Sequence, residues 1–181
     1  MSDNFGERQN VIDPGLGSNQ ARVRAFNERL ALSLIRRHRE LPKVEIARRT
    51  GLSAQTVSVI VRSLENDGLI RRGTPVRGKV GQPSVPMSLN PEGVYSIGLK
   101  IGRRSADLVL MNFVGDISRS VSRSYSWPTP QEVSNFVEEG LKALVDDLPV
   151  SARTRIAGLG IAAPGQLWNW AKEIRAPDKE M

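Results

Sequence analysis

The sequence predicts two domains, a mainly helical first domain of the α+β class and an α/β second domain whose elements follow the order βββαβ. Apolar residues recur at helical spacing up to about residue 66. From residue 95 onward, short apolar stretches alternate with polar residues, as they do in strands. Positive charge is concentrated in residues 22–79, where 14 Lys or Arg accompany 5 Asp or Glu, a net charge of +9, whereas the other residues have a net charge of −2.

Composition excludes several classes of protein. The chain has 181 residues, of which 39% are apolar and 25% are charged, so we expect it to fold. It lacks an apolar run of the roughly 18 residues that a membrane-spanning helix needs, and its polar N-terminus is not a secretory signal. It has no cysteine, which excludes disulfides and thiolate metal sites. We therefore expect a cytoplasmic protein without a membrane partner.

The beginning of the chain is predicted to be an arm followed by two helices. Residues 1–18 are expected to be disordered, because a proline and two glycines interrupt any helical pattern there. A helix is expected over about residues 19–38, where four apolar residues lie on one stripe: Val23, Phe26, Leu30 and Leu34. Pro42 suits the first turn of a second, short helix. This helix is expected to end at Thr50-Gly51, since glycine permits a left-handed turn.

Residues 52–69 contain signals for the start and the end of a third helix. Ser53 is a good N-cap, and the apolar residues on either side of the cap can form a hydrophobic staple. Gly68 can take the left-handed conformation after the helix, which lets Leu69 pack back on it. The expected buried face consists of Val57, Ile60, Val61 and Leu64. The residues expected on the outside are Ala54, Gln55, Ser58, Val59 and Arg62.

The second and third helices, joined by a short turn containing glycine, are predicted to form a helix-turn-helix over about residues 43–66. In such a motif the second helix enters the DNA major groove with its N-terminal residues facing base edges. Gln55 can pair with an adenine edge, whereas Thr56 and Ser58 are expected to contact phosphate. The side chains expected at the groove are those of Ser53, Ala54, Gln55 and Ser58. The alternative is an ordinary helical corner whose polar face meets water.

A two-stranded wing is predicted directly after the third helix, over about residues 69–89. Leu69–Arg71 and Val85–Leu89 are expected to be short strands, and Pro86 requires an edge position in the sheet. The basic, glycine-rich loop between them suits contact with phosphates or with the minor groove. The residues expected to contact phosphate are Arg48, Arg62, Arg71, Arg77 and Lys79. Residues 19–91 are thus predicted to be a DNA-binding domain, although a solvated basic surface would explain the charge alone equally well.

The second domain is predicted over residues 92–181. Three successive strands are expected: YSIGLKIG, SADLVLMNF and ISRSVSRSY. Gly115-Asp116 is expected in the turn between the last two. Pro128 and Pro130 are expected to open a helix that runs to about Leu148, and IAGLGIAAPG has the composition of a short buried strand.

Four stretches, taken in order, resemble the ROK family (repressors, open reading frames and kinases): GLSAQTVSVIVRSLENDGLI, GQP, IGLKIG and GLGIAAPG. The similarity spans roughly residues 20–170. It implies a winged helix-turn-helix followed by the start of an actin-like, ribonuclease H-like sugar-kinase fold. It also implies a transcriptional regulator that binds double-stranded DNA, in particular a repressor of carbohydrate-related genes.

The chain departs from the family's kinases where those enzymes hold magnesium and phosphates. The resemblance places Lys100 at the position of an acidic residue and Gly102-Arg103-Arg104 at the position of a Gly-Gly-Thr loop. A lysine cannot ligate magnesium, and two arginines cannot form the small turn that cradles phosphate. We therefore expect no catalytic residue, no enzyme activity and no cofactor. No metal site is expected either, because the single histidine, His38, is interpreted as a partner of the first helix's C-terminal dipole or as a phosphate contact.

The resemblance also implies that most of the effector-binding domain is missing, because members of the family are longer than this chain. A sugar effector is then not expected, and a homodimer is one possible state. A sheet without its remaining elements would expose the edge of its last strand. Trp168 and Trp170 either would pack on the missing part or close the small core. We expect residues 95–181 to be marginally stable or to self-associate through that edge.

These observations favour a sequence-specific DNA-binding transcriptional regulator. One alternative is a poorly folded gene remnant or a module that binds something other than DNA, which the absence of an effector pocket would favour. A sugar kinase is the third alternative, and the substitutions at Lys100 and Arg103 oppose it.

Overall fold

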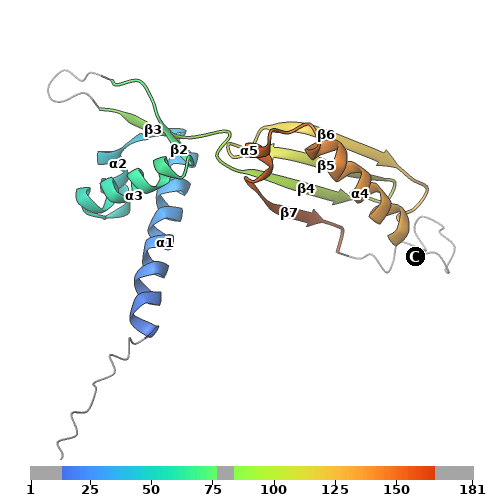
Figure 1. Cartoon of the computed structure of the whole chain (residues 1–181), viewed down its shortest axis with the longest axis horizontal. Helices are drawn as coiled ribbons and strands as arrows, with labels where there is room; N and C mark the ends of the chain where they lie inside the picture. The colour runs from blue at the N-terminus through green and yellow to red at the C-terminus, as the bar shows by residue number, and fades with distance from the viewer. Residues whose placement is uncertain (1–13, 77–83, 166–181) are drawn as a thin grey trace, which may run out of the picture.

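A computed structural model describes residues 14–76 and 84–165, and it describes residues 14–18 by their backbone alone. Figure 1 shows the two predicted domains side by side, one built around helices α1 to α3 and the other around a larger sheet with helix α4 on it. Each domain has its own hydrophobic core. The combination of a helical first domain and a mixed-sheet second domain confirms the predicted fold class.

The first domain is a three-helix unit packed on a small sheet. Its elements are α1 Pro14–His38, β1 Glu40–Pro42, α2 Lys43–Thr50, α3 Ala54–Asn66, β2 Ile70–Arg72 and β3 Pro86–Leu89. One face of each helix and of the sheet closes a core whose largest fully buried side chains are Ile35, Ile46, Val57, Val61, Leu64 and Met87. The predicted inner face of α3 is therefore confirmed, since all four of its residues are buried.

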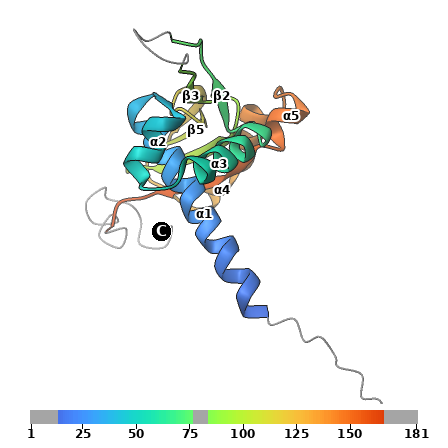
Figure 2. The ribbon, with the colours of Figure 1, turned by 90° about the vertical axis from the view of Figure 1, so that its left-hand side faces the viewer.

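Helix α1 begins earlier than the sequence predicts. It starts at Pro14, so the prediction that residues 14–18 belong to a disordered arm is wrong. Proline fits the first helical position, because its missing amide has no intrahelical partner there and its φ is already helical. In Figures 1 and 2 the N-terminal half of α1 extends away from the rest of the domain. The remainder of the predicted arm, residues 1–13, lies outside the described residues.

Both predicted ends of α3 are confirmed. The Ser53 hydroxyl accepts a hydrogen bond from the Thr56 amide at 3.1 Å, as an N-cap does. At the other end Gly68 has a φ of +72°, and the Leu69 amide donates to the Leu64 carbonyl at 2.9 Å. Together with the bond from the Gly68 amide to the Glu65 carbonyl at 3.0 Å, this is a Schellman motif.

The sheet of the first domain has three strands in the order β1-β3-β2, so the prediction that Pro86 lies on an edge strand is wrong. The central strand tolerates this proline because Pro86 is its first residue and lies opposite Pro42, the last residue of β1. Neither residue has an amide to donate, and the ladder ends there. The Pro86 carbonyl is still used, because it accepts a bond from the Gly73 amide at 2.8 Å.

The second domain has the predicted order βββαβ, with one short helix added. Its elements are β4 Tyr95–Ile101, β5 Ser105–Asn112, β6 Ile117–Ser124, α4 Pro130–Val145, α5 Val150–Arg153 and β7 Ile156–Ala162. The sheet order is β6-β5-β4-β7, and β7 runs parallel to β4. Gly115, with a φ of +101°, makes the predicted turn between β5 and β6. Helix α4 packs on β5 and β6 and buries Phe136 and Leu144 against them.

Strand β7 is not the buried strand that its composition predicts. Six of its seven residues are exposed, and the exposed fractions of Leu159 and Ile161 are 41% and 65%. The reason is its place at the edge of the sheet, beyond the two strands on which α4 packs. The expected exposed strand edge is present among the described residues. Trp168 and Trp170, which were expected to pack on the missing part or to close the small core, lie outside the described residues.

The two domains are joined by a short turn with several backbone contacts. Gly93 donates its amide to the Asn90 carbonyl at 2.9 Å, and the Asn90 side-chain amide donates to the Gly68 carbonyl at 2.8 Å. From the second domain, Arg155 donates to the carbonyls of Gly93 at 2.9 Å and of Asp67 at 3.2 Å. One guanidinium therefore links the end of α3 to the turn and to the start of β7.

We expect the Gly93→Ala variant to be destabilised by about 1–3 kcal/mol, because overpacking a tight site carries costs of this size. A β-carbon at position 93 would lie 2.8 Å from the Gly68 carbonyl oxygen and 3.0 Å from the Asn90 carbonyl oxygen, and both are backbone atoms that cannot rotate away. Urea unfolding followed by circular dichroism measures the loss. The control is Gly165→Ala, where no atom of the described residues lies within 4 Å of the added carbon; an equal loss there would contradict the steric argument.

Candidate nucleic-acid interface

The outer face of α3 presents short polar side chains at its N-terminal end. Ala54 and Gln55 are exposed, and Thr56 and Ser58 are half-buried. Figure 2 looks onto the first domain with α3 in front of the sheet. No hydrogen bond engages the Gln55 side-chain amide within the described part of the chain, so both its donor and its acceptor are available to a partner.

Two of the predicted contact residues are already used within the protein. The Ser53 hydroxyl caps α3 and also lies 2.8 Å from the Thr56 hydroxyl. A hydroxyl has one proton and two lone pairs, so Ser53 has little capacity left for an additional partner. Ser53 is thus placed to shape the start of α3, while Gln55 and Ser58 are placed to face outward.

The arginines predicted to contact phosphate differ in whether an acidic side chain already pairs with them. Arg62 is exposed on α3, close in sequence to the polar face, and no ion pair joins it to a described residue. Arg48 on α2 is also exposed, but it pairs with Glu45 at 2.8 Å. The hydrogen bond from Arg48 lowers the pKa of the Glu45 carboxyl and raises that of Arg48. Arg77 and Lys79 lie outside the described residues.

Arg71 is not brought to the α3 face. Its neighbour Ile70 is buried in the core beneath the helices, and successive side chains of a strand point to opposite faces. Arg71 therefore lies on the outer face of the sheet, in register with Ser88 and, through it, Glu40. This row lies on the face of the sheet opposite the buried core.

The arginine that does reach α3 from the wing is Arg72, which the sequence analysis did not single out. It makes a two-pronged ion pair with Glu65 on α3, at 2.6 and 2.9 Å. The hydrogen bond from Arg72 lowers the pKa of the Glu65 carboxyl. A second missed contact joins Arg24 on α1 to the Ser63 hydroxyl of α3 at 2.8 Å. No sequence motif marks either pair, because each depends on how the elements are packed.

The single histidine lies at the C-terminus of α1, as predicted. His38 Nε2 is 3.1 Å from a guanidinium nitrogen of Arg49 on α2. Arginine only donates, so this imidazole nitrogen is the acceptor. Within the described residues no group of three or more His, Asp or Glu side chains is arranged to hold a metal ion.

A closed turn forms at the positions where the resemblance expects the phosphate loop of the family's kinases. Lys100 is exposed on β4, with its ammonium 3.9 Å from Asp107. The Tyr125 hydroxyl donates toward the carbonyls of Gly102 and Ser105, at 2.8 and 2.9 Å. Burial raises the pKa of the Tyr125 phenol. The tyrosine thus covers the backbone between β4 and β5.

Among the described helices, none has the length and apolar character required to cross a membrane.

Comparisons with known proteins agree with this architecture. Residues 27–71 match a family described as winged helix-turn-helix DNA-binding. The chain is 28% identical over 152 residues to a putative xylose repressor of Caldicellulosiruptor sp., an alignment that covers 81% of this chain and 37% of that protein. It is 24% identical over 119 residues to the DNA-binding transcriptional dual regulator NagC of Escherichia coli, covering 66% of this chain and 28% of NagC.

A solved structure shares the fold. The crystal structure of a ROK family transcriptional regulator, a homologue of the E. coli MLC protein, aligns with a TM-score of 0.59 and 18% sequence identity. The alignment covers 79% of this chain and 36% of that one. The resemblance to ROK family regulators inferred from the sequence is thereby confirmed, and the chain spans less than half the length of the relatives named here.

Proposed function

We propose that this chain is the DNA-reading part of a sequence-specific transcriptional regulator, a repressor of carbohydrate-related genes that acts in the cytoplasm. The observation that supports it best is the outer face of α3. At the N-terminal end of α3, which a recognition helix directs at base edges, this face presents short polar side chains. A cap at each end of the helix holds it in place.

In this proposal α3 enters the major groove and Gln55 pairs with the edge of an adenine. Ala54 and Ser58 permit close approach, and Ser53 and Thr56 fix the first turn of α3 against the phosphates. Arg62 supplies a phosphate contact, and Arg48 a weaker one because Glu45 already neutralises part of its charge. Arg77 and Lys79 would extend the phosphate contacts along the wing.

The proposed regulatory role rests on the relatives. The putative xylose repressor aligns with 81% of this chain, and its name gives both a sugar and repression. The regulator NagC aligns with 66% of this chain, its name gives DNA binding, and a protein with the same degree of similarity is named an N-acetylglucosamine repressor. We propose further that this chain is not a kinase. Lys100 occupies the position expected of a metal-binding acid, and Tyr125 closes the adjoining turn.

Selection of the purified chain on a random double-stranded DNA library tests the proposal, with the enriched sequences titrated at two salt concentrations. Enrichment of one motif supports a sequence-specific regulator, and an inverted repeat would add that two copies bind together. Weak binding that is steeply salt-dependent, without any enrichment, would contradict sequence-specific recognition. ATP titration of the same preparation tests the absence of kinase function, and saturable binding would contradict it.

We expect Arg62→Gln to weaken binding to all DNA sequences and to reduce the salt slope by about one ion, because one phosphate contact is lost. Arg71→Gln should leave the slope unchanged, because this side chain lies on the face of the sheet opposite the helices. The matched control is Lys100→Gln, which removes the same charge from the second domain. Equal losses in all three variants would indicate a response to net charge alone and contradict the proposed contact.

A further inference from the structure

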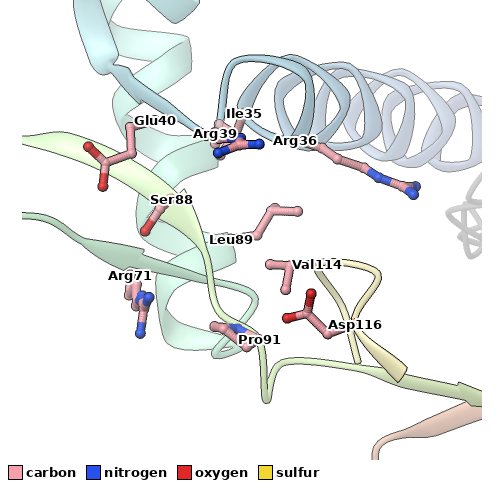
Figure 3. A pocket seen from close by; sticks show the side chains of 10 residues that line it. All are labelled: Ile35, Arg36, Arg39, Glu40, Arg71, Ser88, Leu89, Pro91, Val114 and Asp116. Carbon is pink, nitrogen blue, oxygen red and sulfur yellow. The ribbon is translucent and has the colours of Figure 1, made fainter. Parts of the chain in front are cut away.

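An open cavity of about 490 Å³ lies where the two domains meet, away from the outer face of α3. Figure 3 shows side chains reaching it from three sides: the end of α1, the outer face of the small sheet and the turn between β5 and β6. The charged and polar side chains that line it are those of Arg36, Arg39, Glu40, Arg71, Ser88 and Asp116. Cavities of this size commonly hold small-molecule ligands.

The backbone at Arg39 is unusual. Arg39 follows the last residue of α1 and has a φ of +65°, the left-handed conformation that helices commonly adopt just after their C-terminus. Glycine is the usual residue at such a position, because any side chain raises its free energy. Among the described residues Arg39 is the one non-glycine residue with a positive φ. An arginine here is strained, and its side chain lines the cavity beside the end of α1 (Figure 3).

The arginines of the cavity have no charged partner among residues 14–76 and 84–165. None of Arg36, Arg39 and Arg71 forms an ion pair with a described residue. Two carboxylates also line the cavity: Glu40, without an ion pair to the described residues, and Asp116, which accepts a hydrogen bond from the Asn112 side chain at 3.2 Å. Three cations and two anions leave the cavity with a net charge of +1.

We propose that this cavity binds a small anion that carries hydroxyl groups, such as a hydroxy acid or a sugar phosphate. Guanidinium groups bind carboxylate or phosphate with paired hydrogen bonds, which gives the arginines their role. Glu40 and Asp116 accept hydrogen bonds from hydroxyls, and Ser88 can donate or accept. A simple anion would leave these acceptors unused, and a neutral sugar would leave the arginines unpaired.

The site spans both domains. Arg39, Glu40 and Arg71 belong to the first domain, while Asp116 belongs to the turn between β5 and β6 of the second. A ligand in contact with both is expected to favour one arrangement of the DNA-binding domain relative to its neighbour. The proposal does not depend on the identity of the DNA sequence, because binding is measured without DNA.

Isothermal titration of the full chain with four probes tests the proposal. Gluconate has a carboxylate and hydroxyls, glucose 6-phosphate has a phosphate and hydroxyls, acetate has only the anion and glucose has only the hydroxyls. Binding of gluconate or glucose 6-phosphate, at least about tenfold tighter than acetate and glucose, is the expected result for a site that uses both kinds of group. Comparison of the two anions then identifies the preferred acid.

The decisive variant is Arg39→Gly, which removes the guanidinium and suits the left-handed backbone, so the fold should be kept or stabilised. We expect its affinity for the preferred probe to fall at least about tenfold. Arg37→Gln is the control, because it removes the same charge from the adjacent turn of α1 without lining the cavity. Equal affinity in Arg39→Gly and the control, or no binding by the intact chain, would overturn the proposal. So would a loss of DNA affinity in Arg39→Gly without any probe binding, which would assign the arginine to DNA.

Discussion

The Leu64→Ala variant is expected to lose about 2–5 kcal/mol of folding free energy, the range measured when a buried leucine is truncated in a packed core. Leu64 is 1% exposed and lies where α3 meets the rest of the first core. Its carbonyl also accepts the Leu69 amide that closes the Schellman motif. Domains of this size have a total stability of only about 5–15 kcal/mol, so the loss should populate the unfolded first domain measurably.

Urea unfolding of the full chain measures this loss, and DNA titration of the same variant should show a lower active fraction. Val59→Ala is the matched control, because Val59 lies on the same helix and its exposed fraction is 56%. Its effect on stability should stay within about 0.5 kcal/mol, as is usual at exposed positions. A loss in Val59→Ala as large as in Leu64→Ala would mean that the assigned inner and outer faces of α3 are wrong.

The third helix was predictable because its determinants are local in sequence. Ser53 and Gly68 act on amides and carbonyls within a few residues, and the caps form in the structure as the sequence indicates. The buried stripe follows from helical spacing alone. The order βββαβ was predictable for a similar reason, since the first three strands and α4 each show their own period and β7 is a short apolar run.

Strand β1 was not predictable, because it forms by pairing with residues that are distant in the sequence. It contains three residues and ends in a proline, and it is a strand only because β3 pairs with it more than forty positions later. Its presence moves β3 to the centre of the sheet, which is why the edge position inferred for Pro86 failed. Pairing between distant segments determines which strand becomes an edge, and no local pattern records it.

Arg71 shows how a shift of one residue changes a functional assignment. In a strand, neighbouring side chains lie on opposite faces, so the identity of the inward residue determines where each arginine points. The structure buries Ile70, which directs Arg71 outward and leaves Arg72 to pair with Glu65 on α3. The sequence indicates a basic wing, but only the packed structure shows that Arg72 lies beside α3 and Arg71 at the domain junction.

Strand β7 fails as a buried strand for a related reason. Its apolar residues predict burial, but burial depends on what packs against them, and among the described elements α4 packs on β5 and β6 rather than on β7. The expected marginal stability or self-association of residues 95–181 stays a prediction. Exposed Leu159 and Ile161, on the strand that forms the edge of the described sheet, are the features that would support it.

Gln55→Ala is expected to change the preference of the protein at one base pair by about 1–3 kcal/mol, because one paired contact with an adenine edge is lost. Gln55 is exposed near the N-terminus of α3, where a recognition helix approaches the bases, and its amide has no partner within the described residues. Binding to phosphate should remain, so affinity for unrelated DNA and the salt slope should change little.

Parallel library selections on the intact chain and the variant measure the change position by position. Gln131→Ala is the matched control, because it removes the same amide from α4, where Gln131 bonds to Asn135. The control should reproduce the intact chain's motif. Relaxed preference at a single position in Gln55→Ala identifies the base that α3 reads, since loss of a phosphate contact would lower affinity at every sequence alike. An unchanged motif would remove Gln55 from the reading face and leave Ser58 and Arg62 as the next side chains to substitute.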